Sequence, residues 1–372
     1  MKGYLPTLDG WRAFAIFGVI ANHITLSYFY PHGPFPNDKA LLVSMRLGAK
    51  GVEIFFAISG FLICSRLLQE QRQYGQISLR AFYVRRFFRI LPPYIFYLAA
   101  LSWVASKGLI VIDEYEWVGC LLFIRNYFID PKAVGTMWYT AHFWSLSVEE
   151  HFYLFWPLLL VLCGISRARR VVVPIALLIA SWRWLDQHFS LAHVSHITRR
   201  TDTCLDGLLW GCWAALLLEM PACKEWITRH LTTPVWLAIF ATWLLVICYE
   251  PPLSALGEAF LTPWLLVGTV LHPTTSVSRL LESSPLRWIG RLSYSLYLWQ
   301  QLFLMGSVHE RHPFALGALQ ELPLNLVGVF AMAMASYYLI ERPMIGLGQR
   351  VASGYLAMPA RVGEAPMPLP SS

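Results

Sequence analysis

LDGWRAFAIFGVIANHI, at residues 8–24, is an apolar stretch that carries one arginine and one histidine, Arg12 and His23. A helix that spans a bilayer needs roughly 20 predominantly apolar residues, and this stretch extends over residues 9–30. Arg12 and His23 are separated by about three helical turns, so both side chains face the same way, about 16 Å apart along the axis. Ionisable groups inside hydrocarbon are costly and usually mark a pathway or a site. The first predicted span therefore offers a fixed cation and a titratable base on one face.

The other interpretation of this pair is structural. Arg12 would extend its side chain to the membrane surface, and His23 would hydrogen-bond to a neighbouring helix. Spacing alone does not choose between the two interpretations.

The composition extends the membrane prediction to the whole chain. Of its 372 residues, 56% are hydrophobic and only 14% are charged, whereas soluble domains carry roughly 25% charged residues. The formal net charge of +7 is spread over alternate loops and forms no single basic patch. This distribution argues against nucleic acid as a partner and favours anionic membrane lipids.

The predicted fold class is all-α: a polytopic transmembrane helical bundle of about ten spans. No linker or internal repeat divides the chain, so residues 1–350 are predicted to form one transmembrane domain and residues 351–372, rich in Pro, Gly, Ala and Ser, a disordered cytoplasmic tail. Residues 117–129 are apolar but too short to span, and are predicted to be interfacial or re-entrant. The predicted spans lie near residues 9–30, 51–69, 91–111, 143–164, 171–187, 204–220, 234–250, 255–271, 287–307 and 322–341.

Lys and Arg residues set the predicted orientation. They concentrate in the loops that ten spans would place on the side of the two termini. An excess of positive charge is typical of cytoplasmic loops. Both termini are therefore predicted to lie in the cytoplasm.

FYVRRFFRILPPY, at residues 82–94, places an arginine cluster at the predicted cytoplasmic boundary. Arg86 and Arg89 are three positions apart and share a helix face. The planar guanidinium fork suits phosphate groups, and coenzyme A carries such phosphates on the cytoplasmic side. The alternative is anchoring of the cluster to anionic lipid.

HFWSLSVEEHFYLFWP, at residues 142–157, carries a carboxylate that could assist a base. Ser147 and Glu150 match the capping box that starts a helix, which predicts a structural role for Glu150. Glu149 shares a helix face with Ser145 and His142. A carboxylate in this place can orient and stabilise an imidazole that removes a hydroxyl proton.

Weaker candidates lie beside these motifs. Glu53 and Ser59 in GVEIFFAISGFLI, together with His142 and Ser145, are candidates for a supporting layer around the site. Arg200 and Asp202 in RRTDTCLDGLLWG could pair with each other or take part in catalysis. The nearby histidines match no common metal-ligand spacing, so no metal site is expected; they are His188, His193 and His196.

Together these motifs resemble the membrane-bound acyltransferase-3 family, which includes bacterial polysaccharide O-acetyltransferases. The resemblance extends from about residue 7 to about residue 345. Its pieces, in order, are LDGWRAFA with an R-x10-H spacing, GVEIFFAISGFLI, YVRRFFRILP, FWSLSVEEHFYLFWP, RTDTCLDGLLWG, IGRLSYSLYLWQ and SYYLIERP.

The resemblance implies ten core helices in a bacterial inner membrane and an acyl-CoA donor that arrives from the cytoplasm. It also implies functional roles for the Arg and His of R-x10-H, for the R-x-x-R pair and for the first Glu of SLSVEE; in this chain they are Arg12, His23, Arg86, Arg89 and Glu149. Two departures stand out. Gln300 occupies a place where many members carry His, and the chain ends without the periplasmic esterase-like domain of some members, so acyl delivery is expected to finish within the membrane domain.

The sequence therefore predicts an O-acyltransferase, most simply an O-acetyltransferase, that acts on a hydroxyl of a glycan or a lipid-linked sugar. Arg86 and Arg89 would bind acetyl-CoA, Arg12 would guide its pantetheine arm, and His23, oriented by Glu149, would be the general base. No permanently bound cofactor is expected. The alternative function is a transporter or flippase for a lipid-linked glycan. A purely structural scaffold would leave the intramembrane Arg and His unexplained.

Overall fold

The computed structural model describes residues 4–29, 39–128, 138–192, 199–305 and 316–356, and within these ranges every regular element is a helix. The predicted all-α class is confirmed. The α-helices are α1 (Pro6–Ile24), α2 (Lys39–Tyr74), α3 (Leu79–Ser106), α4 (Glu114–Leu121), α5 (Trp138–Ala141), α6 (Phe143–Cys163), α7 (Ile165–Phe189), α8 (Thr201–Cys204), α9 (Asp206–Leu218), α10 (Pro221–His230), α11 (Thr233–Tyr249), α12 (Ser254–Leu271), α13 (Ser276–Leu281), α14 (Ser284–Phe303), α15 (Leu324–Ser336) and α16 (Arg342–Ser353). Two π-helical turns, η1 (Thr25–Phe29) and η4 (Tyr337–Glu341), and a 3₁₀ turn, η3 (Gly317–Gln320), complete the elements.

Each of the ten predicted spans falls on a helix, but the number of membrane crossings stays a prediction. Five helical stretches in the described ranges are long and apolar enough to cross a bilayer. They become six if α10 and α11, which meet at an angle of 83°, count as one broken span. The helices α1, α7 and α14 fall short of this criterion, and α9 has only 13 residues.

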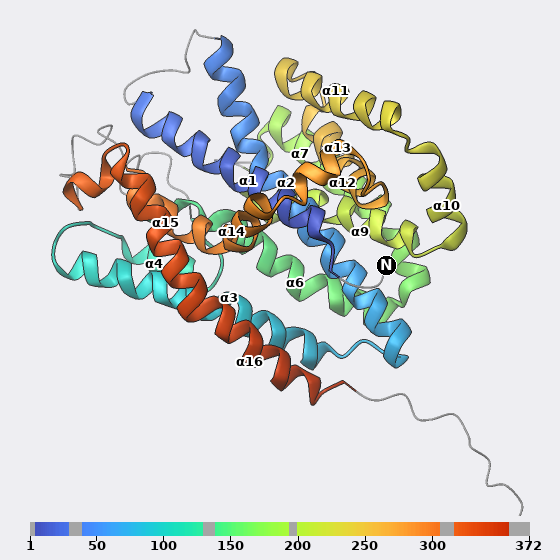
Figure 1. The fold of residues 1–372 in the computed structure, drawn as a ribbon, viewed down its shortest axis with the longest axis horizontal. Helices are drawn as coiled ribbons and strands as arrows, with labels where there is room; N and C mark the ends of the chain where they lie inside the picture. The colour runs from blue at the N-terminus through green and yellow to red at the C-terminus, as the bar shows by residue number, and fades with distance from the viewer. Residues whose placement is uncertain (1–3, 30–38, 129–137, 193–198, 306–315, 357–372) are drawn as a thin grey trace, which may run out of the picture.

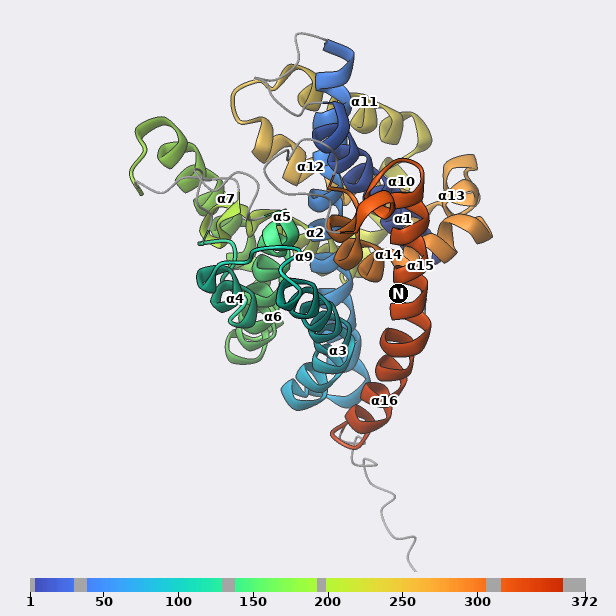
Figure 2. The ribbon, with the colours of Figure 1, turned by 90° about the vertical axis from the view of Figure 1, so that its left-hand side faces the viewer.

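The centre of the bundle is formed by α2, which packs most extensively on α1 and α9 (Figure 2). Glycines allow this close approach. A Cβ atom on Gly60 would lie 1.9 Å from the carbonyl oxygen of Leu208, and one on Gly211 would lie 2.4 Å from that of Ala57. Helices in a membrane associate through such small residues because lipid provides little hydrophobic drive between them.

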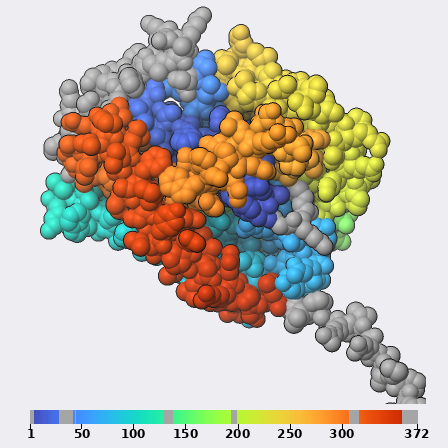
Figure 3. All heavy atoms as spheres, in the orientation of Figure 1, coloured from blue at the N-terminus to red at the C-terminus, as the bar shows by residue number. Residues whose placement is uncertain are grey.

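The helix α14 lies across α1 on the face drawn in Figure 3, and α15, η4 and α16 continue beside it in red. At one edge α16 packs along α3 (Figure 1). The described helices thus gather α1, α2, α6 and α14 around the centre, where the polar residues of the predicted site lie.

The helix α3 begins at Leu79, well before the predicted span at residue 91. Ser78 caps it by accepting a hydrogen bond from the Ala81 amide at 3.2 Å. Glu70, at the end of α2, accepts from the Ser78 amide and pairs with Arg85, both at 2.7 Å. The arginine cluster therefore lies inside a helix whose direction is fixed by this turn.

The capping-box prediction is wrong. The helix α6 begins at Phe143, so Ser147 lies inside it and donates its hydroxyl hydrogen bond to the Phe143 carbonyl at 2.9 Å. A serine inside a helix commonly makes this bond to the preceding turn. Glu150 therefore does not cap the helix.

Two other predictions meet the structure only in part. In the segment 117–129, α4 ends at Leu121, and an eight-residue helix is too short to span. The predicted tail starts inside α16, which continues to Ser353, and residues 357–372 lie outside the described part of the chain.

Candidate active site

Four arginines converge on one cavity in the centre of the bundle. We call it the arginine cavity; its volume is about 90 Å³. Arg12 comes from α1, Arg66 from α2, and Arg86 and Arg89 from α3. The structure thus brings together the three arginines predicted to bind the donor. The side chains that complete the lining include Phe55, Ser59, Leu62, Ser145, Glu149, Tyr153, Ser293, Tyr294 and Tyr297.

Most of this positive charge is not neutralised by ion pairs. Arg12 pairs with Asp9 at 3.2 Å, and Asp9 also accepts a hydrogen bond from Tyr4. Arg86 stacks on the Tyr153 ring, with its guanidinium carbon 4.8 Å from the ring centroid. Within the described ranges, the guanidinium groups of Arg66, Arg86 and Arg89 form no ion pair. The cations that do form ion pairs in these ranges are Arg12, Arg46, Lys50, Arg72, Arg85, Arg125, Arg183, Arg200 and Arg229.

Among the described lining residues of the arginine cavity, Glu149 is the one carboxylate. It accepts hydrogen bonds from Ser59 at 3.0 Å and from Tyr153 at 2.7 Å. These donors come from α2 and from the next turn of α6, so the carboxylate is held in a fixed orientation. Its charge offsets part of the charge of Arg12 and Arg86, as expected for opposite charges in a poorly hydrated site.

A second cavity, of about 410 Å³, adjoins the first. We call it the histidine cavity because His23 and His142 both line it. Its polar lining also includes Asn22, Lys50, Glu53, Arg183, Arg199, Asp206 and Gln301. A volume in the range of 300–1,000 Å³ is typical of small-molecule sites.

His23 is oriented by α14 and not by Glu149, so the predicted contact between His23 and Glu149 is wrong. The Nδ1 atom of His23 lies 3.1 Å from Oε1 of Gln300. An amide oxygen only accepts, so Nδ1 carries the hydrogen and Nε2 keeps its lone pair. Nε2 lies 3.5 Å from the side-chain nitrogen of Gln301. Glu149 contributes to the other cavity because its helix face points toward α2 and α3.

Gln301 joins the two histidines. Its oxygen accepts from Nδ1 of His142 at 2.6 Å and from the His142 backbone amide at 3.2 Å, while its nitrogen points to His23. Nε2 of His142 is buried and has no hydrogen-bond partner among the described residues. His142 therefore lies in the same polar group as His23, as a supporting residue.

Three side chains line both cavities and so form the wall between them: Val52, Phe56 and Tyr297. The Tyr297 hydroxyl donates to the His142 carbonyl at 2.5 Å and contacts the Ser145 hydroxyl at 2.7 Å. Among the described residues, these three side chains therefore mark the place where the two cavities adjoin.

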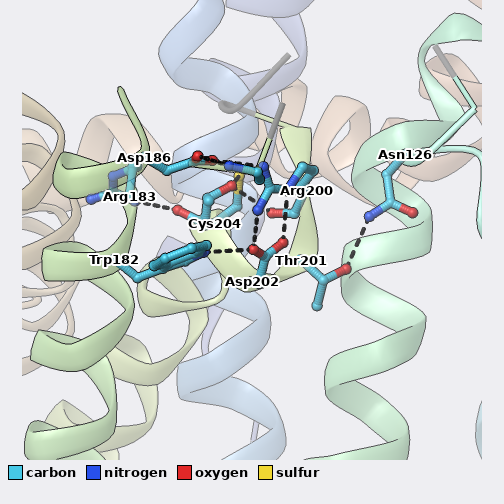
Figure 4. Close-up of polar contacts among 10 residues, drawn as sticks. Asn126, Trp182, Arg183, Asp186, Arg200, Thr201, Asp202 and Cys204 are labelled. Carbon is cyan, nitrogen blue, oxygen red and sulfur yellow. Dashed lines mark hydrogen bonds and ion pairs between the residues drawn. The ribbon is translucent and has the colours of Figure 1, made fainter. Parts of the chain in front are cut away.

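Arg200 and Asp202 line neither cavity. Figure 4 shows that Arg200 lies between Asp186 and Asp202, and that Asp202 also accepts from Trp182 at 2.7 Å. The Arg200–Asp186 pair measures 2.7 Å. These contacts hold the start of α8 against α7.

The remaining predicted residues are divided between the cavities. Ser59 and Ser145 lie in the arginine cavity, and Glu53 lies in the histidine cavity, paired with Lys50 at 2.9 Å. No group of three metal-ligating side chains occurs in the described part of the chain, and His193 and His196 lie outside it.

Sequence reasoning missed Arg66, Arg199, Tyr297 and Gln301. Arg66 was counted among the positive charges of a predicted cytoplasmic loop, whereas it lies inside α2. The α14 residues did leave a signal: Ser293, Tyr297 and Gln301 are polar, lie in an apolar run and follow one another at four-residue spacing. This spacing places them on one face of the helix.

The fold and the two adjoining cavities define an all-α integral membrane protein with polar cavities at its centre. A family model described as an acyltransferase domain matches residues 5–342, and the chain therefore belongs to the acyltransferase-3 family.

Relatives of this chain include bacterial proteins that are named as O-acetyltransferases. YrhL of Bacillus subtilis is 30% identical over 93% of this chain and 56% of its own length. OatA of Staphylococcus aureus, an O-acetyltransferase, is 27% identical over 80% of this chain and 50% of its own length. OatA of Listeria monocytogenes, a peptidoglycan O-acetyltransferase, is 27% identical over 92% of this chain and 56% of its own length. The chain thus spans about half the length of these relatives, and no solved structure matches it.

Proposed function

We propose that this protein is a membrane-embedded O-acetyltransferase. It takes an acetyl group from acetyl-CoA on the cytoplasmic side and transfers it to a hydroxyl of a glycan or lipid-linked sugar. The protein lies in the bacterial cell membrane with both termini in the cytoplasm and holds no permanently bound cofactor. The names of the relatives support O-acetyl transfer to a glycan.

The observation that carries this proposal is the uncompensated charge of the arginine cavity. Three guanidinium groups, those of Arg66, Arg86 and Arg89, face one small space without an ion pair among the described residues. Clustered positive charge in a poorly hydrated site is costly unless an anion binds there. The phosphates of coenzyme A would supply that anion through charge-assisted hydrogen bonds.

The size of the arginine cavity indicates which part of the donor enters it. A volume of about 90 Å³ is too small for a nucleotide but admits a slender chain. A smaller polar recess adjoins it, shares Arg12, Leu62 and Arg66, and leads toward Tyr4 and Gln69. The phosphates would remain near the arginines while the thioester end reaches the wall at Tyr297.

His23 would act as the general base in the histidine cavity. Its Nε2 lone pair takes the proton of the acceptor hydroxyl as the oxygen attacks the acetyl carbonyl carbon. A new C–O bond forms, the C–S bond to coenzyme A breaks, and the thiolate leaves on the side of the arginines. The proton on His23 then returns to the thiolate through water. Gln300 holds the ring in the required tautomer.

Glu149 has a different proposed role from the one predicted by sequence. It balances part of the charge of Arg12 and Arg86 beside the thioester, so the donor is not held too tightly after transfer. Ser59 and Tyr153 keep the carboxylate in this place.

Transfer of labelled acetyl from acetyl-CoA, with the purified protein in proteoliposomes, tests the proposal. We expect an alkali-labile acetyl ester on the glycan and no product without donor. Movement of glycan across the vesicle wall without ester formation would instead support the transporter alternative.

The donor site is tested by replacing Arg86 and Arg89 with alanine. Two charge-assisted contacts of about 1.5–3 kcal/mol each would be lost, so affinity for coenzyme A should fall at least roughly 100-fold. Arg80→Ala is the matched control, because Arg80 is exposed on the same helix and lines neither cavity. Unchanged affinity in the double variant would leave these arginines as lipid anchors.

A further inference from the structure

Two consecutive arginines, Arg199 and Arg200, stand directly before α8, and their surroundings differ. Arg200 is held by Asp186 and Asp202 (Figure 4), so its charge is used within the protein. Thr201, the next residue, is also held in place, because its hydroxyl accepts a hydrogen bond from the side-chain amide of Asn126 at 2.9 Å. Arg200 and Thr201 are therefore anchored directly after Arg199.

Arg199 lines the histidine cavity. Its guanidinium carbon lies 5.9 Å from the centroid of the Trp144 ring, a cation–π contact. Within the described ranges it makes no hydrogen bond and no ion pair, and its side chain is partly exposed. The anchored Arg200 and Thr201 hold the Arg199 backbone in place, so its position does not depend on a charged partner.

The other cations of this cavity are neutralised. Lys50 pairs with both Glu53 and Glu258. Arg183 binds both carboxylate oxygens of Asp206, at 2.8 and 2.9 Å. Among the described lining residues, Arg199 is thus the cation without an acidic partner.

We propose that Arg199 binds an oxyanion of the acceptor, either a carboxylate on the sugar or the pyrophosphate of a lipid-linked sugar. This inference rests on the proposed function, because it assigns the histidine cavity to the acceptor. A planar guanidinium fork recognises both oxyanions through two parallel hydrogen bonds. A neutral glycan would leave the charge of Arg199 without a partner.

Binding of an anion here would also assist His23. Arg199 lies close enough for its charge to act on the His23 ring. A bare positive charge opposes formation of the imidazolium when the base takes its proton. An acceptor oxyanion on Arg199 would cancel this repulsion, so the base would be most effective once the correct acceptor is bound.

Three acceptors in the proteoliposome assay distinguish the possible sources of the oxyanion. They are a neutral oligosaccharide, the same oligosaccharide oxidised to a uronate, and the neutral oligosaccharide carried on a prenyl pyrophosphate. We expect the wild-type protein to prefer one of the two charged acceptors over the neutral one, and the preferred acceptor identifies the source. Equal use of all three would overturn the proposal.

The Arg199→Ala variant should raise KM for the preferred charged acceptor roughly 10- to 100-fold. KM for acetyl-CoA should stay unchanged. Activity toward the neutral acceptor should not fall, because the positive charge that opposes the His23 imidazolium is removed, and Arg199→Lys should recover part of the loss toward the charged acceptor. The control is Arg46→Ala, since Arg46 pairs with Glu250 at 2.8 Å and lines neither cavity.

The assay distinguishes failure of the Arg199 oxyanion site from failure of the proposed acetyl transfer. An equal loss toward all three acceptors in Arg199→Ala would show that Arg199 only supports the fold, and would overturn the oxyanion site while leaving acetyl transfer intact. Absence of ester on every acceptor in the wild-type protein, with coenzyme A bound, would overturn the proposed function itself.

Discussion

His23 lies in a chain of hydrogen bonds that sets its chemistry. Gln300 fixes the proton on Nδ1 and leaves Nε2 free to act as base. An amide, unlike a carboxylate, provides no negative charge to stabilise the imidazolium. Orientation is therefore the main contribution of Gln300, and loss of its side chain should lower the rate without affecting donor binding.

We expect His23→Ala to lower the transfer rate about 10²–10⁴-fold. Gln300→Ala should lower it less, and the double variant should be little worse than His23→Ala, because residues that act as a unit are not additive. Glu149→Gln should instead add its effect to that of His23→Ala, since Glu149 lies in the other cavity. Both comparisons of single and double variants are made on transfer rates from labelled acetyl-CoA. Affinity for coenzyme A is measured on the same variants.

The opposite pattern would contradict this geometry. If His23 and Glu149 were strongly coupled and His23 and Gln300 were additive, the carboxylate would orient the base after all. Full activity in His23→Ala would remove the general-base role entirely.

The sequence predicted the individual residues of the site better than their contacts. Helical spacing places Glu149 and His142 on one face of their own helix, but it does not show which neighbouring helix that face meets. In the structure the face is divided: Glu149 meets α2 and α3, while His142 meets Gln301 on α14. The partners of His23 lie 277 and 278 positions away along the chain, and no local pattern indicates contacts at that separation.

At the scale of the helices, the contact between α2 and α9 depends on the absence of side chains. A Cβ atom at Gly60 would lie 1.9 Å from the Leu208 carbonyl oxygen, and the backbone cannot yield that distance cheaply. Extra atoms in a well-packed interior typically cost about 1–3 kcal/mol. Because α2 supplies residues to both cavities, its displacement would affect the site as well as stability.

Gly60→Ala should therefore lower the thermal stability of the protein in detergent and weaken coenzyme A binding together. Gly346→Ala is the matched control, since a Cβ atom there has no heavy atom within 4 Å and alanine favours a helix. Thermal unfolding followed by intrinsic fluorescence measures both variants. Equal melting temperatures for Gly60→Ala and the wild type would show that α2 and α9 can move apart without loss of thermal stability.

The ranges of the helices were largely predictable, whereas their ends were not. Apolar runs of sufficient length mark where a helix must lie, because backbone groups in lipid need internal partners. The start of α3 was missed because polar residues there continue the helix, and Arg85 pairs with Glu70. The span predicted from residue 143 does begin where α6 begins, but the capping box at Ser147 was wrong because Ser147 bonds to the turn before it. Local sequence gave no sign of either partner.

For the whole molecule, the arrangement of the cavities requires a particular membrane topology. Under the proposed function a cytoplasmic donor would reach the arginine cavity, and the positive charges of the loops favour placing both termini of a ten-span chain in the cytoplasm. The helices that satisfy length and composition alone would give at most six spans. The two topologies differ most clearly at α7, which carries Arg183 and Asp186 in its second half.

Epitope tags inserted at four positions between the predicted spans distinguish these topologies: Asp113, Arg167, Ser190 and Ser283. With ten spans, tags at Arg167 and Ser283 face the cytoplasm, and tags at Asp113 and Ser190 face outward. With six spans, α7 does not cross, so Ser190 lies on the same side as Arg167 and only Asp113 is opposite. We expect ten spans, because Arg183 is bound to Asp206 within the bundle and its charge is therefore compensated inside the membrane. Protease access to each tag in sealed vesicles gives the answer, and an inward Ser190 tag would exclude the ten-span arrangement.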